Sequence, residues 1–161
     1  MDWNNKVEKK EAYEIFLAQT KALLMNERNM IANLANTSAL LNDLLPNTVF
    51  SGYYLYNGAE LILGPFQGGV SCVHIQLGKG VCGLSAESKK TVIVDDVKNF
   101  DNYISCDARA RSEIVVPVLS ANGDLLAVLD IDASVEAAYD EIDQEYLEKF
   151  CQILVENTDF A

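Results

Sequence analysis

Two apolar runs decide the fold: Glu113-Ile114-Val115-Val116-Pro117-Val118-Leu119 and Leu125-Leu126-Ala127-Val128-Leu129-Asp130-Ile131. Asn122-Gly123 lies between them, and this dipeptide is a strong signal for a hairpin. Because both runs are hydrophobic almost without interruption, we expect two strands with both faces covered by other elements. A paired, covered sheet is therefore the first structural prediction.

Helical periodicity dominates the N-terminal part of the chain. Through residues 9–45 apolar side chains recur at steps of three and four, and the polar break at 26–29 favours two helices over the alternative of one kinked helix. Pro46 ends the second helix, because the residue before a proline avoids the α-helical region. Near the C-terminus, Asp140 is expected to cap a closing helix. Its apolar stripe is Leu147, Phe150, Cys151 and Leu154.

Short strands and turns are predicted in the middle of the chain. Residues 49–56 and 60–63 form a second hairpin around Asn57-Gly58. We expect Pro65 and Gly68-Gly69 to break the second of these strands. Further expected elements are strands at 72–77 and 91–94, a short helix at 80–90 and a long loop at 97–110. Helices, then hairpin-rich strands, then a helix predict an α+β fold with helices packed on a mainly antiparallel sheet.

Composition limits the classes of partner. A chain of 161 residues with 50% apolar and 22% charged residues is long enough for one soluble domain with its own core. The formal charge of −12 disfavours nucleic acid and anionic membrane surfaces. The N-terminus lacks the apolar segment of a signal peptide, and no apolar run is long enough to span a membrane. We therefore expect a cytoplasmic protein whose thiols are reduced at rest.

Sulfur is the reactive group that the sequence offers. Cys72, Cys82 and Cys106 fall close together in the chain, whereas the chain has only one histidine. Cys106 lies in a polar loop, where Arg109 and Arg111 would raise its thiolate fraction and Asp107 would oppose them. A fourth cysteine, Cys151, is interpreted as a buried hydrophobic side chain. The spacing of the first three suits a nucleophile with resolving thiols.

Two other kinds of site are alternatives to this interpretation. Cys72 and His74 would share one face of a strand and, with Cys82 and Cys106, could form a Cys₃His zinc site, but the close cysteine pairs of structural zinc sites are absent. His74 alone is interpreted as a surface residue. Gly78-Lys79-Gly80-Val81-Cys82-Gly83 matches G-x-G-x-x-G without the βαβ unit that a dinucleotide site needs. No metal and no cofactor are predicted.

Three carboxylates form the second candidate constellation. Asp130 and Asp132 share one face of the second apolar run, at the end of a strand that is otherwise hydrophobic. Glu113 opens the neighbouring run, but the sequence leaves its register with the two aspartates open. If the three converge, they could hold an ammonium group and supply a proton.

Together these segments resemble the GAF-domain free methionine-(R)-sulfoxide reductases, over residues 47–155. The resemblance rests on these motifs: Leu63-Gly64-Pro65-Phe66-Gln67-Gly68, Cys72, Gly78-Lys79-Gly80-Val81-Cys82-Gly83, Cys106-Asp107-Ala108, Ser112-Glu113-Ile114-Val115-Val116-Pro117 and Val128-Leu129-Asp130-Ile131-Asp132. It implies one GAF-like domain over residues 1–161, with a helical part at 1–45 and a GAF core at 47–155. The implied fold is a central antiparallel sheet flanked by N-terminal and C-terminal helices, often as a homodimer.

The resemblance also implies roles for individual residues. Cys106 takes the catalytic position and Cys72 and Cys82 the resolving positions. Glu113, Asp130 and Asp132 take the substrate-binding and acid–base positions. Tyr54 takes a pocket aromatic position, and Phe50 stands where the family commonly has tryptophan.

The implied reaction is thiol-dependent reduction of free L-methionine (R)-S-oxide to L-methionine. Cys106 becomes a sulfenic acid, Cys72 or Cys82 converts it to a disulfide, and a thioredoxin-type dithiol regenerates the thiols. The alternative is a GAF module that senses a small molecule without turnover. Such a sensor normally carries an effector domain or a long signalling helix, and we expect neither from this chain.

Overall fold

A six-stranded antiparallel sheet forms the centre of the molecule, with strand order β3-β2-β1-β6-β5-β4. The computed structural model describes residues 1–160. The strands are β1 (Thr48–Tyr56), β2 (Glu60–Gly68), β3 (His74–Gln76), β4 (Val92–Val94), β5 (Ser112–Leu119) and β6 (Leu125–Ala133). The predicted antiparallel α+β architecture is confirmed.

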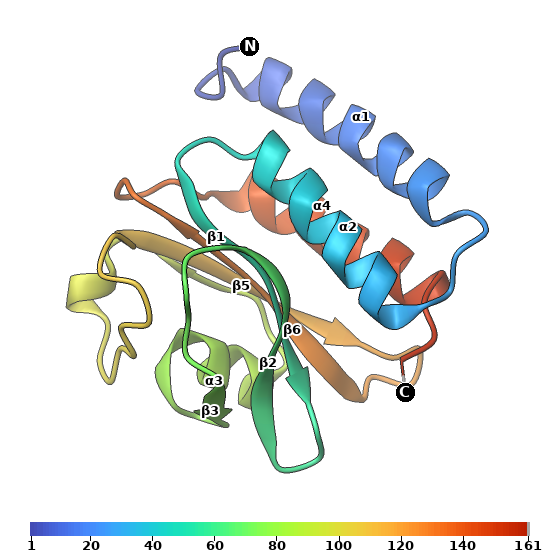
Figure 1. Cartoon of the computed structure of the whole chain (residues 1–161). Coiled ribbons are helices and arrows are strands. Elements are labelled where there is room, and N and C mark those ends of the chain that lie inside the picture. Colours follow the sequence, from blue (N-terminus) through green and yellow to red (C-terminus); the bar gives the residue numbers. More distant parts are fainter. Residues whose placement is uncertain (161) are drawn as a thin grey trace.

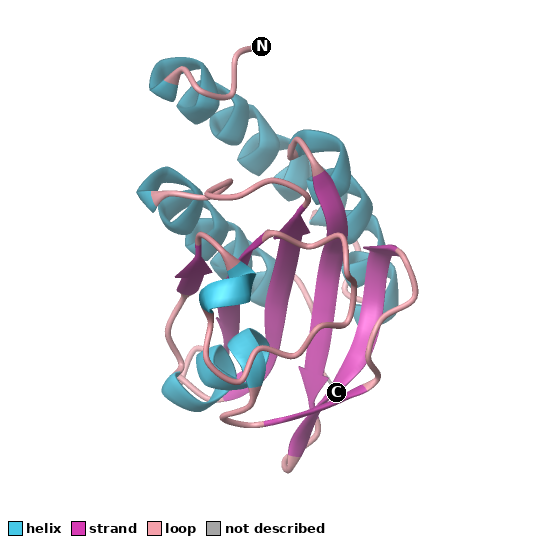
Figure 2. Ribbon diagram, turned by 90° about the vertical axis from the view of Figure 1, so that its left-hand side faces the viewer, coloured by secondary structure: helices cyan, strands magenta, loops and turns pink. Residues whose placement is uncertain are grey.

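Helices cover the two faces of the sheet unequally. Two long helices pack on one face, α2 (Met30–Leu44) and α4 (Glu141–Glu156), and a third, α1 (Lys6–Leu24), packs on those two helices. The other face carries the short helix α3 (Gly80–Ser88), a 3₁₀ turn at Val97–Asn99 and the loops around them. Figures 1 and 2 show this division. Among residues 1–160 no helix combines the length and apolar character that a membrane crossing requires.

Strands β5 and β6 are covered on both faces, which explains why their sequences show no alternation of apolar and polar residues. Ile114 and Ile131 are among the residues that face the long helices, and Val115 and Val128 belong to the cluster under α3. All four side chains are fully shielded from solvent. Both faces of the hairpin are therefore buried, as its continuous hydrophobicity predicts.

Strand β2 is longer than predicted. It continues past Pro65 to Gly68, and Gly68 pairs with Phe50 of β1. The register shifts where Gly64 and Pro65 lie opposite the single residue Tyr53, so the proline occupies a β-bulge. A proline is tolerated there because a bulge leaves one residue outside the regular hydrogen-bond pattern.

Strand β3 is shorter than predicted. Only His74–Gln76 pair with β2, so Cys72 precedes the strand, and the argument that Cys72 and His74 share a strand face is wrong. The imidazole of His74 is exposed and its Nδ1 lies 2.9 Å from Glu60 Oε1. Its interpretation as a surface residue is confirmed.

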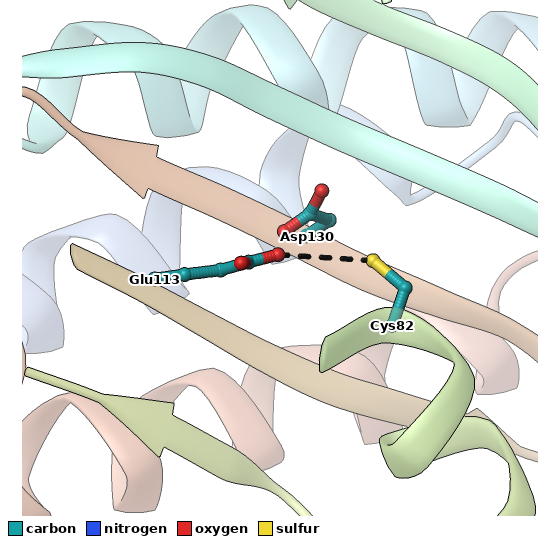
Figure 3. Close-up of side chains that lie close together, drawn as sticks. All are labelled: Cys82, Glu113 and Asp130. Carbon is teal, nitrogen blue, oxygen red and sulfur yellow. Dashed lines mark hydrogen bonds between the residues drawn. The ribbon is translucent and has the colours of Figure 1, made fainter. Parts of the chain in front are cut away.

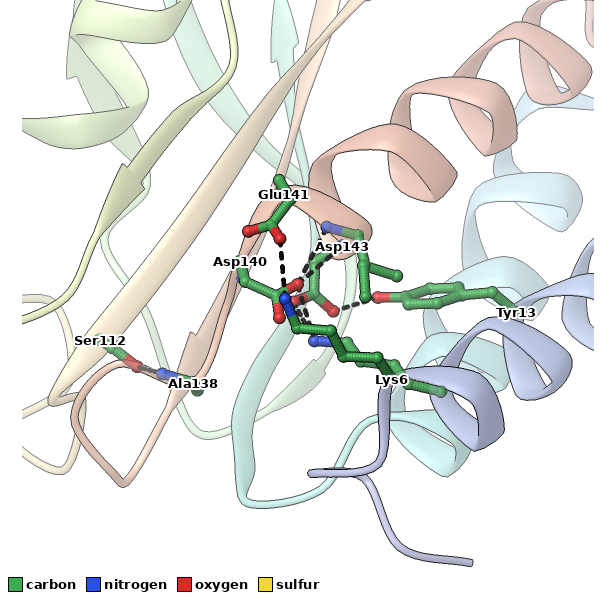
Figure 4. A network of polar contacts seen from close by, with 9 residues as sticks. Lys6, Tyr13, Ser112, Ala138, Asp140, Glu141 and Asp143 are labelled. Atoms are coloured by element: carbon green, nitrogen blue, oxygen red, sulfur yellow. Dashed lines mark hydrogen bonds and ion pairs between the residues drawn. The ribbon is translucent and has the colours of Figure 1, made fainter.

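A buried ion pair joins α1 to the start of α4. Lys9 of α1 places its Nζ 2.5 Å from Asp143 Oδ2 and 3.0 Å from Asp140 Oδ1. Tyr13 donates a hydrogen bond of 2.6 Å to Asp143 Oδ1 (Figure 4). Asp140 and Asp143 also form the capping box that begins α4, so the predicted cap is confirmed and serves the contact between helices too.

We predict that Lys9→Met destabilises the protein by about 3–5 kcal/mol, because Asp143 would remain buried without its cation. Equilibrium unfolding in urea measures this. Lys6→Met is the matched control, because Lys6 forms an exposed ion pair with Glu141. The control should change the free energy of unfolding by about 1 kcal/mol or less. Equal effects of the two substitutions would contradict a buried charge contact.

Candidate active site

Three carboxylates meet on the sheet face that α3 covers. Glu113 of β5 pairs directly with Asp132 of β6, and Val115 pairs with Asp130, so the strand register that the sequence left open brings the three acids together. Glu113, Asp130 and Asp132 are only 5%, 5% and 8% exposed. The convergence that the sequence left open is therefore present in the structure.

Cys82 approaches this cluster from the first turn of α3 (Figure 3). Its Sγ donates to Glu113 Oε1 at 3.9 Å, and ligand atoms of Cys82, Glu113 and Asp130 all lie within 4.8 Å of one another. The thiol is buried. Cys82 is therefore part of the acid cluster as well as of the cysteine set.

Burial and mutual repulsion favour the protonated forms of these groups. Burial raises the pKa of Glu113 well above its ordinary value, and the nearby Asp130 and Asp132 raise it further. Burial raises the pKa of Asp132 in the same way, with a contribution from Asp130. The pKa of the Cys82 thiol is also raised, first by burial and then by the carboxylates around it. Glu113 is therefore suited to donate a proton, and Cys82 is not a ready thiolate.

The other two cysteines of the set are covalently joined. Cys72 and Cys106 form a disulfide with 5.3 Å between their Cα atoms, although 34 positions separate them in sequence. Both residues are half-buried. Cys151 is a free, buried thiol in α4, as predicted. Cys106 and Cys72 are thus close enough in the fold to form a disulfide bond with each other.

An aromatic wall closes one side of the site. The rings of Phe50 and Tyr54 stack with centroids 6.1 Å apart, and Phe66 stacks on Phe50 at 5.1 Å. The hydroxyl of Tyr54 lies 2.9 Å from Ser71 Oγ and donates to the carbonyl oxygen of Cys72 at 3.2 Å. Tyr54 therefore provides apolar surface and also positions the segment that carries Cys72.

Most of these groups line a single pocket. Phe50, Tyr54, Cys82, Cys106, Glu113, Asp130 and Asp132 line it, while Cys72 adjoins it through the disulfide. Sequence reasoning missed Lys79, Ser71, Tyr103 and Ile104, which also line it. Tyr103 and Ile104 are large side chains in an otherwise polar loop just before Cys106, and this contrast is the signal that could have identified them.

The four side chains of the alternative zinc site do not come together, because Cys72 and Cys106 are joined to each other and the His74 imidazole contacts Glu60. One expectation about this region is wrong. The arginines do not act as free cations beside Cys106. Arg109 Nη2 lies 2.7 Å from Asp107 Oδ2, and Arg111 pairs with Glu136. Both guanidinium groups therefore form ion pairs with nearby carboxylates.

One polar atom of the cluster has no partner within the described chain. Asp130 Oδ1 is buried and accepts no hydrogen bond. No ion pair among residues 1–160 involves Glu113, Asp130 or Asp132. Buried carboxylates without partners are costly unless a cation or donor reaches them. The site is therefore built to receive a positively charged or hydrogen-bond-donating ligand.

Comparison with known proteins places this site in a family. Residues 37–155 match a family that is described as "GAF domain". A free methionine-R-sulfoxide reductase of Saccharomyces cerevisiae is 38% identical over 161 residues, covering 96% of this chain and 89% of the relative. An enzyme of the same description from Escherichia coli is 40% identical over 139 residues, covering 86% and 84%.

A solved structure extends the comparison to three dimensions. The free methionine-R-sulfoxide reductase of Neisseria meningitidis, in complex with its substrate, superposes with a TM-score of 0.88 at 38% identity. The match covers 92% of this chain and 89% of that chain.

We predict that Asp132→Asn stabilises the protein by about 1–2 kcal/mol at pH 8 and much less at pH 5. A carboxyl whose folded pKa is raised contributes stability below its unfolded pKa, near 4, and this contribution is lost as pH rises through the folded pKa. The amide side chain of the variant does not ionise, so the variant does not lose this stability at high pH. Thermal unfolding at both pH values measures the effect, with Asp43→Asn on the exposed surface of α2 as control. A gain that is independent of pH would contradict the assignment.

Proposed function

The chain belongs to the GAF domain family and, within it, to the free methionine-R-sulfoxide reductases, and from this premise we propose that it reduces free L-methionine (R)-S-oxide to L-methionine. The observation that carries the proposal is the meeting of a Cys72–Cys106 disulfide with three buried acids at one cavity. A redox thiol pair supplies two electrons, and the acids supply a proton and a site for an ammonium group.

The cavity offers complementary surfaces for the two ends of a free amino acid. Asp130 and Asp132 would hold the α-ammonium group, and the unpartnered oxygen of Asp130 is available for it. Lys79 and the first turn of α3 also line the cavity. The first N–H groups of a helix have no acceptor within the helix, so they suit the α-carboxylate. A residue inside a peptide has neither charge, which favours the free amino acid.

The aromatic wall would receive the apolar end of the substrate. Phe50 and Tyr54 line the cavity with stacked rings, and such a surface suits a sulfur-bound methyl group. Phe50 provides this surface without the larger ring and the N–H of tryptophan. We therefore assign the position of the S-methyl group to this wall.

The proposed reaction begins at Cys106. Its thiolate attacks the sulfoxide sulfur while Glu113 donates a proton to the sulfoxide oxygen, so that a bond forms between the Cys106 sulfur and the substrate sulfur. The hydroxyl group then moves to the Cys106 sulfur while the substrate S–O bond and the new S–S bond break, so methionine leaves and Cys106 becomes a sulfenic acid. The thiol of Cys72 then displaces this oxygen as water and forms the Cys72–Cys106 disulfide. A thioredoxin-type dithiol returns two electrons and two protons.

The pairing of Cys72 with Cys106 supports our proposal that Cys72 is the first resolving thiol. Cys82 remains a thiol beside Glu113, and its raised pKa disfavours attack on a sulfenic acid in this state. We therefore propose that Cys82 contributes to the polar environment of Glu113, and that it enters disulfide exchange only after a rearrangement.

We predict that the protein, supplied with dithiothreitol, releases methionine from the R epimer of free methionine sulfoxide and not from the S epimer. Cys106→Ala should abolish the release, because the attacking sulfur is lost. Cys151→Ala is the control, and this variant should retain most activity because Cys151 lies in α4, on the opposite face of the sheet. Chromatographic quantification of methionine measures the outcome. Absence of release from either epimer would leave a binding module without turnover.

Glu113→Gln should lower turnover by roughly 10²-fold or more, because the amide cannot donate a proton of comparable acidity. In the parent protein, turnover should fall as pH rises through the raised pKa of Glu113, since its protonated form is the donor. The variant should lack this basic limb. Initial rates between pH 6 and 9 measure both effects. An unchanged basic limb in the variant would transfer the donor role to another group.

A further inference from the structure

We propose that the Cys72–Cys106 disulfide is reopened by attack on the Cys72 sulfur, by a dithiol protein that contacts the exposed side chains of Val70 and Val73. This inference rests on the proposed function and adds the place where electrons enter. Three observations carry it: the side of the cavity on which each sulfur lies, the exposure of the flanking residues, and the hydrogen bonds that hold their segment.

The two sulfurs of the disulfide face different surroundings. Cys106 lines the substrate cavity, together with the acids and the aromatic wall. Cys72 is absent from that lining and lies on the segment 69–73, which connects β2 to β3 across the surface. A protein too large to enter the cavity therefore reaches Cys72 more readily than Cys106. Attack on Cys72 also releases Cys106 as the thiolate that the next cycle needs.

The residues around Cys72 form an apolar contact site. Val70 is 94% exposed, more than any other large hydrophobic residue among residues 1–160, and Val73 is 51% exposed. Both lie within two residues of Cys72. Transient redox encounters use small interfaces, below about 1,200 Å² in total. We therefore place the two valines beside the disulfide at the centre of a small, short-lived contact with a thioredoxin-type protein.

Hydrogen bonds and packing contacts with the rest of the molecule fix the conformation of the segment 69–73. Leu63 donates its N–H to the carbonyl oxygen of Val73 at 2.8 Å, and the Tyr54 hydroxyl donates to the carbonyl oxygen of Cys72 at 3.2 Å. On the other side, the segment packs against the Arg109–Asp107 pair, because a Cβ at Gly69 would lie 2.9 Å from Arg109 Nη2. Val70 and Val73 thus remain outside while Cys72 stays next to Cys106.

The exchange is balanced in atoms and electrons. A thiolate of the dithiol protein attacks Cys72 Sγ, a mixed disulfide forms, and Cys106 leaves as a thiolate. The second thiol of the partner then attacks its own sulfur in the mixed disulfide and releases Cys72. This chain gains two electrons and two protons, and the partner becomes a disulfide.

The test compares two electron donors for one variant. V70S/V73S should raise the KM for thioredoxin about fivefold or more, because two apolar contacts are lost. Its turnover with dithiothreitol should stay within twofold of the parent, since a small thiol needs no contact surface. V7S is the matched control, because Val7 is 66% exposed on α1. An unchanged KM for thioredoxin, or an equal loss with both donors, would overturn the contact site.

A second measurement identifies the attacked sulfur without relying on turnover. A thioredoxin whose second active-site cysteine is replaced by serine should form a stable mixed disulfide with the oxidised protein. Peptide mass spectrometry should place this bond on Cys72, and a bond on Cys106 would overturn the inference. Because trapping needs no methionine sulfoxide, it remains informative if the proposed reduction fails. Methionine release with dithiothreitol, in turn, tests the reduction independently of the contact site.

Discussion

The crowding of three carboxylates in a buried place is the constraint on which the site depends. Adjacent strands of one sheet bring Glu113 and Asp132 opposite each other and hold Asp130 on the same face. Within residues 1–160 no lysine or arginine forms an ion pair with them. Protonation can relieve part of the repulsion, and a bound cation can relieve the rest. Proton donation and recognition of an ammonium group thus have the same physical origin.

The sheet can hold this arrangement because its central strands are buried on both faces. On the helix side, Ile114 and Ile131 pack into the larger hydrophobic cluster, which anchors β5 and β6. On the opposite side, the same strands carry Val115 and Val128 and then the acids. The larger apolar cluster supplies stability, and the smaller one is interrupted by polar groups. The free-energy cost of burying the carboxylates is therefore offset mainly by apolar packing on the face of the sheet away from the cavity.

Local patterns predicted much of this from the sequence, while long-range pairings escaped it. The hairpin at Asn122-Gly123 and the capping residue Asp140 are set by neighbours in the chain, so they could be predicted. The extension of β2 past Pro65 depends on a bulge opposite β1, which sequence periodicity does not encode. The occupation of Arg109 and Arg111 by carboxylates likewise depends on side-chain geometry. Resemblance to a family, rather than spacing, supplied the roles of Cys72, Cys82 and Cys106.

The bond between Cys72 and Cys106 has a thermodynamic consequence beyond its chemistry. It encloses α3 and Cys82 in a covalent ring, because the joined residues are 34 positions apart. Closing a ring of that size restricts the unfolded chain and is worth about 3–4 kcal/mol by chain-entropy estimates. The oxidised protein should therefore resist unfolding better than the reduced one. In the proposed cycle, each turnover forms this disulfide at the wall of the cavity and then reduces it. The free energy of unfolding therefore rises when the disulfide forms and falls when it is reduced.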